Sequence, residues 1–216
     1  MPAVLKIEFV SDVSCPWCVI GYRSLIEALQ RIGADVEIDL VHRPFELNPN
    51  MVPEGQPLRD YMRYKYGASD AQLASAHEAL RARGESVGFD FRFDKRTHVY
   101  NTFDAHRLLL WANLEGRQRE LKHALFAACF TDGRDISDRR VLEDIADAIG
   151  LDRLGARAVL ESEAHGDEVR ASERQHASRG ITSVPTIIFN DRHRLTGGQP
   201  VNVFEQTIRS LMTSGA

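Results

Sequence analysis

Cysteine is scarce in this chain, at three of 216 residues. A small secreted domain held together by disulfides carries many more, so the composition excludes a disulfide scaffold and fits a reducing compartment. Two of the cysteines lie three residues apart, whereas Cys129 is isolated. Structural zinc sites usually take four Cys or His ligands, commonly as two close pairs, and no second pair has that spacing. The sequence therefore predicts neither a metal nor another bound cofactor.

Long apolar runs and a strong excess of one charge are also absent. No apolar stretch has the length needed to cross a bilayer. Lys and Arg number 27 and Asp and Glu 31, a formal net charge of −4 that offers no basic surface for nucleic acid. The N-terminus enters a strand pattern without the basic and apolar regions of a secretory signal. We expect a cytoplasmic protein whose partners are neither nucleic acid nor membrane.

The segment Cys15-Pro16-Trp17-Cys18 follows a strand pattern at Val4–Val10 and begins an amphipathic helix. Its two cysteines lie on one side of that helix, close enough to form a disulfide. Pro16 suits the first helical position and leaves Cys15 at the cap, where the helix dipole favours a thiolate. The apolar stripe of the helix begins at Cys18 and continues through Tyr22, Leu25, Leu29 and Ile32. We therefore predict an exposed Cys15 that attacks a disulfide and a buried Cys18 that resolves the mixed disulfide.

The other patterns place strands at both ends of the chain and helices between them. A strand at Asp35–Val41 predicts a parallel βαβ unit with the first strand and helix. Strands return at Thr186–Phe189 and His193–Thr196, joined by a turn at Asn190–Asp191, and a helix follows Pro200. The helical patterns between them are Leu58–Tyr66, Asp70–Arg83, Asn101–Leu114, Gln118–Phe130, Asp138–Ile149 and a stretch ending at Ser178, with an extended segment at Val87–Phe93. We predict a discontinuous α/β domain (residues 1–56 and 179–216) interrupted by an all-helical insertion (residues 57–178).

A second motif, Ser183-Val184-Pro185-Thr186, precedes the returning strand. Proline at a strand entrance either begins an edge strand in the trans form or makes a special turn in the cis form. The local sequence leaves both forms open.

These two motifs resemble those of the thioredoxin-fold DsbA-like oxidoreductases, and in particular the FrnE-like subgroup. The resemblance extends to Ser11–Cys18, Asn101–Arg107 and Gly197–Pro200, and so covers essentially the whole chain. It implies a thioredoxin fold with a helical insertion and a thiol–disulfide oxidoreductase or isomerase activity. It also implies that Pro185 is cis and packs against the sulfurs, and that Trp17 and Val184 contact substrate, Val184 through its backbone. The implied partners are disulfide-containing proteins, peptides or small molecules, and glutathione as a redox partner.

A rival resemblance is to the kappa-class glutathione transferases and the 2-hydroxychromene-2-carboxylate isomerases, which share the fold and the insertion. Members of that class carry serine where this chain has Cys15, and an acidic residue near the position of Gln199. Both differences favour the dithiol interpretation.

Four further residues remain open at this stage. Glu8 is a candidate for a buried acid that assists proton transfer from Cys18, although its spacing to Cys15 is one residue too long. Asn101 and His106 either line a cleft or satisfy a helix. Cys129 lies on an apolar helix stripe, where a small buried side chain is the ordinary role.

Overall fold

The computed structural model describes residues 4–33 and 36–213. In this part of the chain a four-stranded sheet has the order β2-β1-β5-β6. β1 (Val4–Ser11) pairs in parallel with β2 (Glu37–Pro44) and antiparallel with β5 (Thr186–Phe189), which pairs antiparallel with β6 (His193–Thr196). The two ends of the chain therefore build one sheet, as the sequence predicts. Asp35, the first residue of the predicted second strand, lies outside the described residues.

The central strands form because their sequences are apolar on the faces that pack. All four residues of β5 are buried, and in β1 Leu5, Ile7 and Phe9 alternate inward. The hairpin between β5 and β6 turns at Asn190 and Asp191, whose φ angles are 46° and 61°. Asn and Asp tolerate this left-handed conformation better than other non-glycine residues, which explains why the chain turns there.

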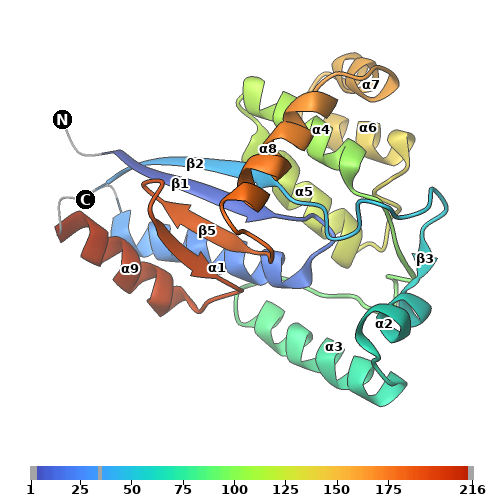
Figure 1. Ribbon diagram of the computed structural model, residues 1–216, viewed down its shortest axis with the longest axis horizontal. Coiled ribbons are helices and arrows are strands. Elements are labelled where there is room, and N and C mark those ends of the chain that lie inside the picture. Colours follow the sequence, from blue (N-terminus) through green and yellow to red (C-terminus); the bar gives the residue numbers. More distant parts are fainter. Residues whose placement is uncertain (1–3, 34–35, 214–216) are drawn as a thin grey trace.

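Helix α1 (Pro16–Ile32) packs beside α9 (Val201–Thr213), the last helix described. Figure 1 shows these two helices side by side along the sheet. The helices α4 (Phe103–Leu114), α5 (Gln118–Phe130) and α8 (Gly166–Ser178) contact β2. None of the described helices is long and apolar enough to cross a membrane.

The insertion divides into two groups of helices in Figure 1. One group, α2 (Leu58–Tyr66) and α3 (Asp70–Glu85), lies beyond the N-terminal end of α1; the other comprises α4 to α8, including α6 (Arg139–Ala148) and α7 (Arg153–Glu161). Two short strands, β3 (Gln56–Pro57) and β4 (His98–Val99), pair antiparallel beside these helices. Each has only two residues, too few for a strand pattern to be recognised in the sequence. The predicted last helical stretch is two helices, separated at His165 in a left-handed conformation.

The alternating segment Val87–Phe93 forms no strand. Its three phenylalanines are buried because their rings pack together and against α5, with Phe91 5.4 Å from the Phe130 ring. The alternation of apolar and polar residues in this segment therefore reflects a loop with one buried side, not a strand. Most buried apolar side chains of the sheet, α1 and the inserted helices belong to one connected cluster. Smaller clusters are formed by Val10, Ile181 and Ile188 and by Leu58, Tyr61 and Val99. The division of the chain into two domains stays a prediction.

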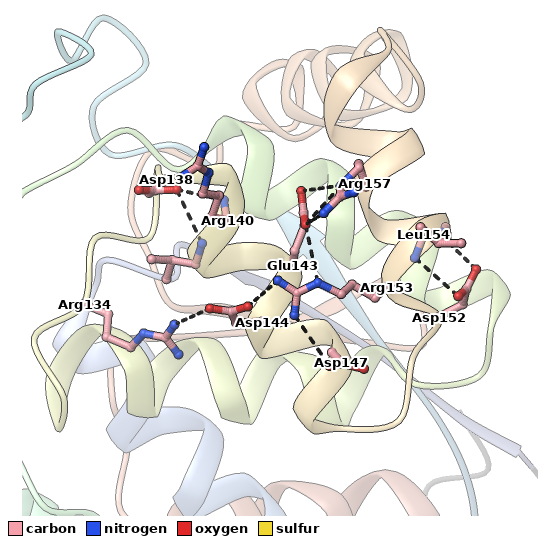
Figure 2. Close-up of polar contacts among 12 residues, drawn as sticks. Arg134, Asp138, Arg140, Glu143, Asp144, Asp147, Asp152, Arg153, Leu154 and Arg157 are labelled. Atoms are coloured by element: carbon pink, nitrogen blue, oxygen red, sulfur yellow. Dashed lines mark hydrogen bonds and ion pairs between the residues drawn. The ribbon is translucent and has the colours of Figure 1, made fainter.

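An ion-pair network joins α6 to α7 (Figure 2). Arg153 contacts Asp144 at 2.5 Å, Asp147 at 3.5 Å and Glu143 at 3.6 Å, and Arg157 contacts Glu143 at 2.8 Å. Both arginines are well exposed, so the network contributes modestly to stability and fixes mainly how the two short helices pack.

Candidate functional site

The dithiol lies where β1 ends and α1 begins. Cys15 is the N-cap residue of α1 in an extended conformation, and Pro16 is the first helical residue, as predicted. The Cys18 N–H donates to the Cys15 carbonyl oxygen at 3.1 Å, which closes the first turn and holds both cysteines on one side of it. Both thiols are free.

The two cysteines differ less in exposure than the sequence predicts. Cys18 is fully buried, as expected, and burial raises the pKa of its thiol well above the ordinary value, with the neighbouring Cys15 adding to the shift. The expectation that Cys15 is exposed is wrong, since only 4% of its surface is accessible. Side chains of α2 and α3 help to line a cavity beside it, a tertiary arrangement that no local sequence pattern predicts.

The Ser183–Thr186 segment lies against the dithiol, although it follows the insertion in sequence. The Val184–Pro185 peptide bond is cis, and the Val184 carbonyl oxygen lies 3.7 Å from the Cys15 sulfur. Pro185 is buried and packs on α1: a Cβ on Gly21 would lie 3.1 Å from the Pro185 Cγ. Gly198 lies close to the first turn of α1: a Cβ on Gly198 would lie 3.0 Å from the Trp17 carbonyl oxygen.

A buried acid, Asp12, organises the loop that leads to Cys15. Its carboxylate accepts hydrogen bonds from the backbone N–H of Ser14 at 3.1 Å and of Leu47 at 2.7 Å. The His106 ring lies 3.7 Å away, and both side chains are almost fully buried. Burial alone would raise the pKa of Asp12, but His106 and the two backbone donors outweigh it and lower the pKa. The carboxylate is therefore charged at neutral pH.

A lysine of α5, Lys122, is also buried beside the dithiol. It has no accessible surface, and its ammonium group has no hydrogen-bond partner among the described residues. Burial lowers the pKa of Lys122 to about 8, although electrostatic interactions with Cys18, Asp12 and Cys15 favour the charged form. His42, likewise buried, has a pKa well below its ordinary value because of burial and the charge of Lys122. The site thus holds a cation close to the resolving thiol.

A cavity of about 350 Å³ opens beside Cys15. Trp17 and Val184 help to line it, and Trp17 is 43% exposed. The structure therefore brings together all five site residues that the sequence predicts. They lie at the start of α1 and in the turn before β5: Cys15, Trp17, Cys18, Val184 and Pro185.

The remaining candidates lie elsewhere. Glu8 pairs with Arg43 at 2.8 Å and with Arg179 at 3.2 Å, which outweighs its burial and lowers its pKa, so its charge is already engaged away from the dithiol. Asn101 accepts a hydrogen bond from the Phe103 N–H at the start of α4. Cys129 is buried in the main apolar cluster.

Sequence reasoning missed Asp12 and Lys122 as parts of the site. A signal existed for both. Asp12 stands three residues before Cys15, and Lys122 falls at helical spacing with Phe126 and Cys129 on an apolar stripe. A lysine in such a stripe ordinarily extends its ammonium group to solvent, so the pattern alone does not indicate burial.

Comparison with solved structures agrees with this fold. A probable DsbA oxidoreductase, SCO1869 from Streptomyces coelicolor, is 35% identical, with a TM-score of 0.87 over 95% of this chain and 89% of that one. A 2-hydroxychromene-2-carboxylate isomerase (14% identity, TM-score 0.74, 97% of each chain) shares the fold. So does the cytosolic disulfide reductase DsbM from Pseudomonas aeruginosa, solved with glutathione (19% identity, TM-score 0.65, 96% of this chain and 99% of that one).

The family described as the DSBA-like thioredoxin domain matches residues 6–209, which include the dithiol, the insertion and the Val184–Pro185 turn. The match covers nearly the whole chain. The sheet order of the chain and its helical insertion fit a DSBA-like thioredoxin fold. The chain belongs to the DSBA-like thioredoxin family.

Proposed function

We propose that this protein is a thiol–disulfide oxidoreductase that exchanges disulfides through Cys15 and Cys18. The observation that supports this most directly is the position of Cys15: it caps a helix N-terminus, with a second free thiol one turn behind it and the Val184 carbonyl oxygen 3.7 Å away. Helix N-termini stabilise a negatively charged sulfur, and thiolates are the reactive species in exchange.

In the reducing direction, the Cys15 thiolate attacks one sulfur of a substrate disulfide. The substrate S–S bond breaks, one thiolate leaves, and a mixed disulfide joins Cys15 to the remaining half. Cys18 then loses its proton and attacks the Cys15 sulfur, which releases the second substrate thiol and leaves a Cys15–Cys18 disulfide. Two equivalents of a thiol reductant such as glutathione return the enzyme to the dithiol. The oxidising direction is the reverse sequence.

The buried charges assist the second step. Burial favours the neutral form of Cys18, whereas the positive charge of Lys122 lowers the pKa of Cys18 and so opposes the effect of burial. Lys122 is therefore a positioning residue that stabilises the Cys18 thiolate as it forms. Asp12 holds the backbone on which Cys15 lies, through its bonds to Ser14 and Leu47.

The substrate-contacting residues follow from the same geometry. Val184 presents its backbone beside the Cys15 sulfur, where an extended substrate could pair with the backbone of the turn before β5, while Trp17 and Pro185 flank the dithiol. Disulfide-containing proteins, peptides or small molecules are the proposed substrates. Glutathione is the proposed redox partner, and the cytosolic reductase DsbM, solved with glutathione, supports this and a cytoplasmic location.

The reduction potential of the Cys15–Cys18 pair tests this function. Protein equilibrated in glutathione buffers of graded ratio and then alkylated should show a single two-electron transition between dithiol and disulfide. A midpoint near −270 mV marks a reductant and one near −120 mV an oxidant. A protein that forms no intramolecular disulfide in any buffer, and releases no thiol from any disulfide, is not an oxidoreductase.

A glutathione-dependent isomerase or transferase is the second candidate, because a 2-hydroxychromene-2-carboxylate isomerase shares the fold across 97% of the chain. Cys15 replaces the serine of that class, and the turn at Gly197–Gln199 carries no acid. Incubating the protein with glutathione and an electrophile, or with 2-hydroxychromene-2-carboxylate, separates the candidates: conversion that survives Cys18→Ser would favour this second one.

A further inference from the structure

The cavity beside Cys15 restricts what can reach the sulfur. Helices α2 and α3 contribute the wall opposite the dithiol, with Tyr61 and Tyr66 from α2 and Leu73 from α3. Its volume of about 350 Å³ is at the small end of the range for small-molecule sites. Only 4% of the Cys15 surface is accessible, and side chains of α2 and α3 line the cavity beside it, so a bulky disulfide on the face of a folded protein is harder to bring to the sulfur than a compact one. A compact disulfide enters the cavity directly.

The cavity wall is mainly apolar and aromatic, but it includes one buried cation, Arg96. Its guanidinium carbon lies 4.6 Å from the centre of the Phe130 ring, and one N–H donates to the Ser14 carbonyl oxygen at 3.2 Å. This is the single hydrogen bond that Arg96 makes within the described part of the chain, although a guanidinium carries five N–H donors.

Arg96 also lacks a negatively charged partner. Among residues 4–33 and 36–213, no carboxylate forms an ion pair with it. Arg96 also lines a second, neighbouring cavity with three acids, Asp60, Asp70 and Asp94; Asp70 pairs with Arg63 and Asp94 with Arg92, and none of the three pairs with Arg96. A buried charge without a partner is costly, and an anion that enters the cavity removes that cost. Guanidinium groups match carboxylates by paired hydrogen bonds.

His77 does not share this role. Its ring stacks on Phe93 at 4.0 Å, and burial, together with the charges of Arg96 and Arg81, lowers the pKa of His77 to about 4. It is therefore neutral at physiological pH. Arg96 is the cation that the cavity offers to a ligand.

We propose that this cavity selects low-molecular-weight disulfides that carry an aromatic or apolar group and a carboxylate, with Arg96 binding the carboxylate while Cys15 attacks the sulfur. The proposal rests on the exchange function above and names the substrate class of that same site. It assigns to Arg96 a specificity role, and to α2 and α3 the exclusion of bulky protein disulfides.

The test compares 5,5′-dithiobis(2-nitrobenzoate) with its uncharged bis-carboxamide, each rate divided by the rate of the same compound with free glutathione. Wild-type protein should favour the carboxylate at least 10-fold in kcat/KM, and should reduce insulin more slowly than either. Arg96→Gln should remove that preference, whereas Arg96→Lys should keep part of it. Arg209→Gln, which removes an exposed charge from α9 and does not line the cavity, is the control and should keep all of it.

Equal normalised rates for the two compounds in wild type, a preference that persists in Arg96→Gln, or faster reduction of insulin would overturn the proposal. A carboxylated diaryl thioether, which has no S–S bond to break, measures binding apart from exchange by calorimetry. If it binds wild type at least 10-fold more tightly than Arg96→Gln while no disulfide is turned over, the cavity assignment stands and the exchange function falls. If disulfides are exchanged without regard to the carboxylate, the exchange function stands and the cavity assignment falls.

Discussion

The sulfur of Cys15 lies 3.7 Å from the carbonyl oxygen of Val184, a residue 169 positions further along the chain. The contact exists because β5 pairs with β1 and so brings the turn before β5 against the N-terminus of α1. A substrate strand that pairs with the Val184 backbone therefore arrives beside the nucleophile. The Val184 backbone and the Cys15 sulfur come from opposite ends of the chain, and one sheet holds them together.

The first prediction follows from the unequal environments of the two thiols. Cys15→Ser should abolish disulfide reduction, because the capping thiolate is lost. Cys18→Ser should still attack substrate but accumulate a mixed disulfide on Cys15, which intact-mass spectrometry detects as an adduct of one substrate half. Cys129→Ser, which changes a buried thiol in the main apolar cluster, is the control and should keep activity. Normal turnover by Cys18→Ser would show that Cys18 is not the resolving thiol.

A second prediction concerns the packing of α1 against the Pro185 turn. A Cβ on Gly21 would lie 3.1 Å from the Pro185 Cγ and 3.4 Å from the Gly198 Cα, so the larger side chain of Gly21→Val must displace that turn. Activity should fall about 10-fold or more, because misplacement of a binding group by ~1 Å can cost on the order of 100-fold in rate. Gly21→Ala should give a smaller loss.

The matched control for this steric effect is Gly166→Ala, where the nearest atom to an added Cβ is 3.6 Å away. Titration of the thiols in unfolded and native protein checks that the cysteines are intact in each variant. Wild-type activity in Gly21→Val would mean that the position of the Pro185 turn does not matter to the reaction.

Periodicity and local chemistry predict the parts of this site that lie on one element. The stripe that begins at Cys18 identifies the buried thiol, and Pro16 identifies the helix start. The turn at Asn190–Asp191 predicts the β5–β6 hairpin. All three are confirmed by the structure.

What the sequence does not reveal depends on contacts between distant elements. Side chains of α2 and α3 line the cavity beside the buried Cys15, and nothing within residues 15–32 indicates that packing. Glu8 is attractive by its spacing, yet Arg43 and Arg179 engage it from β2 and from the end of α8. Arg96 lies in an irregular segment where no period distinguishes a buried arginine from an exposed one.

A third prediction concerns Asp12. Asp12→Asn replaces one carboxylate oxygen with an NH₂ group that cannot accept from the Ser14 or Leu47 N–H, so one buried donor loses its partner. The variant should lose about 2 kcal/mol of unfolding free energy at pH 7. Because the folded pKa of Asp12 lies below 3.8, its stabilisation is complete above pH 3.8 and is lost as the pH falls through the folded pKa.

Urea unfolding at pH 7 and at progressively lower pH measures this effect. The difference between wild type and Asp12→Asn should shrink as the pH falls below 3.8. Glu37→Gln, at an exposed position of β2, is the control and should change stability little. A difference that stays constant with pH would indicate that the carboxylate charge of Asp12 does not stabilise the fold.

The last prediction concerns Lys122, the buried cation beside Cys18. Its pKa of about 8 in the folded protein lies below the ordinary 10.5, so the unfolded state binds more protons between these two values. The contribution of Lys122 to stability, measured as the difference between wild type and a variant without the charge, should therefore rise with pH from 8 to 10.5, and the burial of the charge costs about 3 kcal/mol below pH 8. Lys122→Met keeps the length of the side chain and removes the charge. It should be more stable than wild type at pH 7, by up to about 3 kcal/mol, and the advantage should vanish above pH 10.5.

The same variant should carry out the resolving step, the attack of Cys18 on the mixed disulfide, more slowly than wild type. Without the Lys122 charge the pKa of Cys18 rises further, so the mixed disulfide on Cys15 should persist longer, and the pH profile of its release should shift to higher pH. Stopped-flow release of the second substrate thiol, followed from pH 6 to 10, measures this shift, while the first attack by Cys15 should change less. Lys95→Met, at an exposed position, is the control for both experiments. If Lys122→Met is stabilised but releases the second thiol with the wild-type pH profile, Lys122 does not assist Cys18.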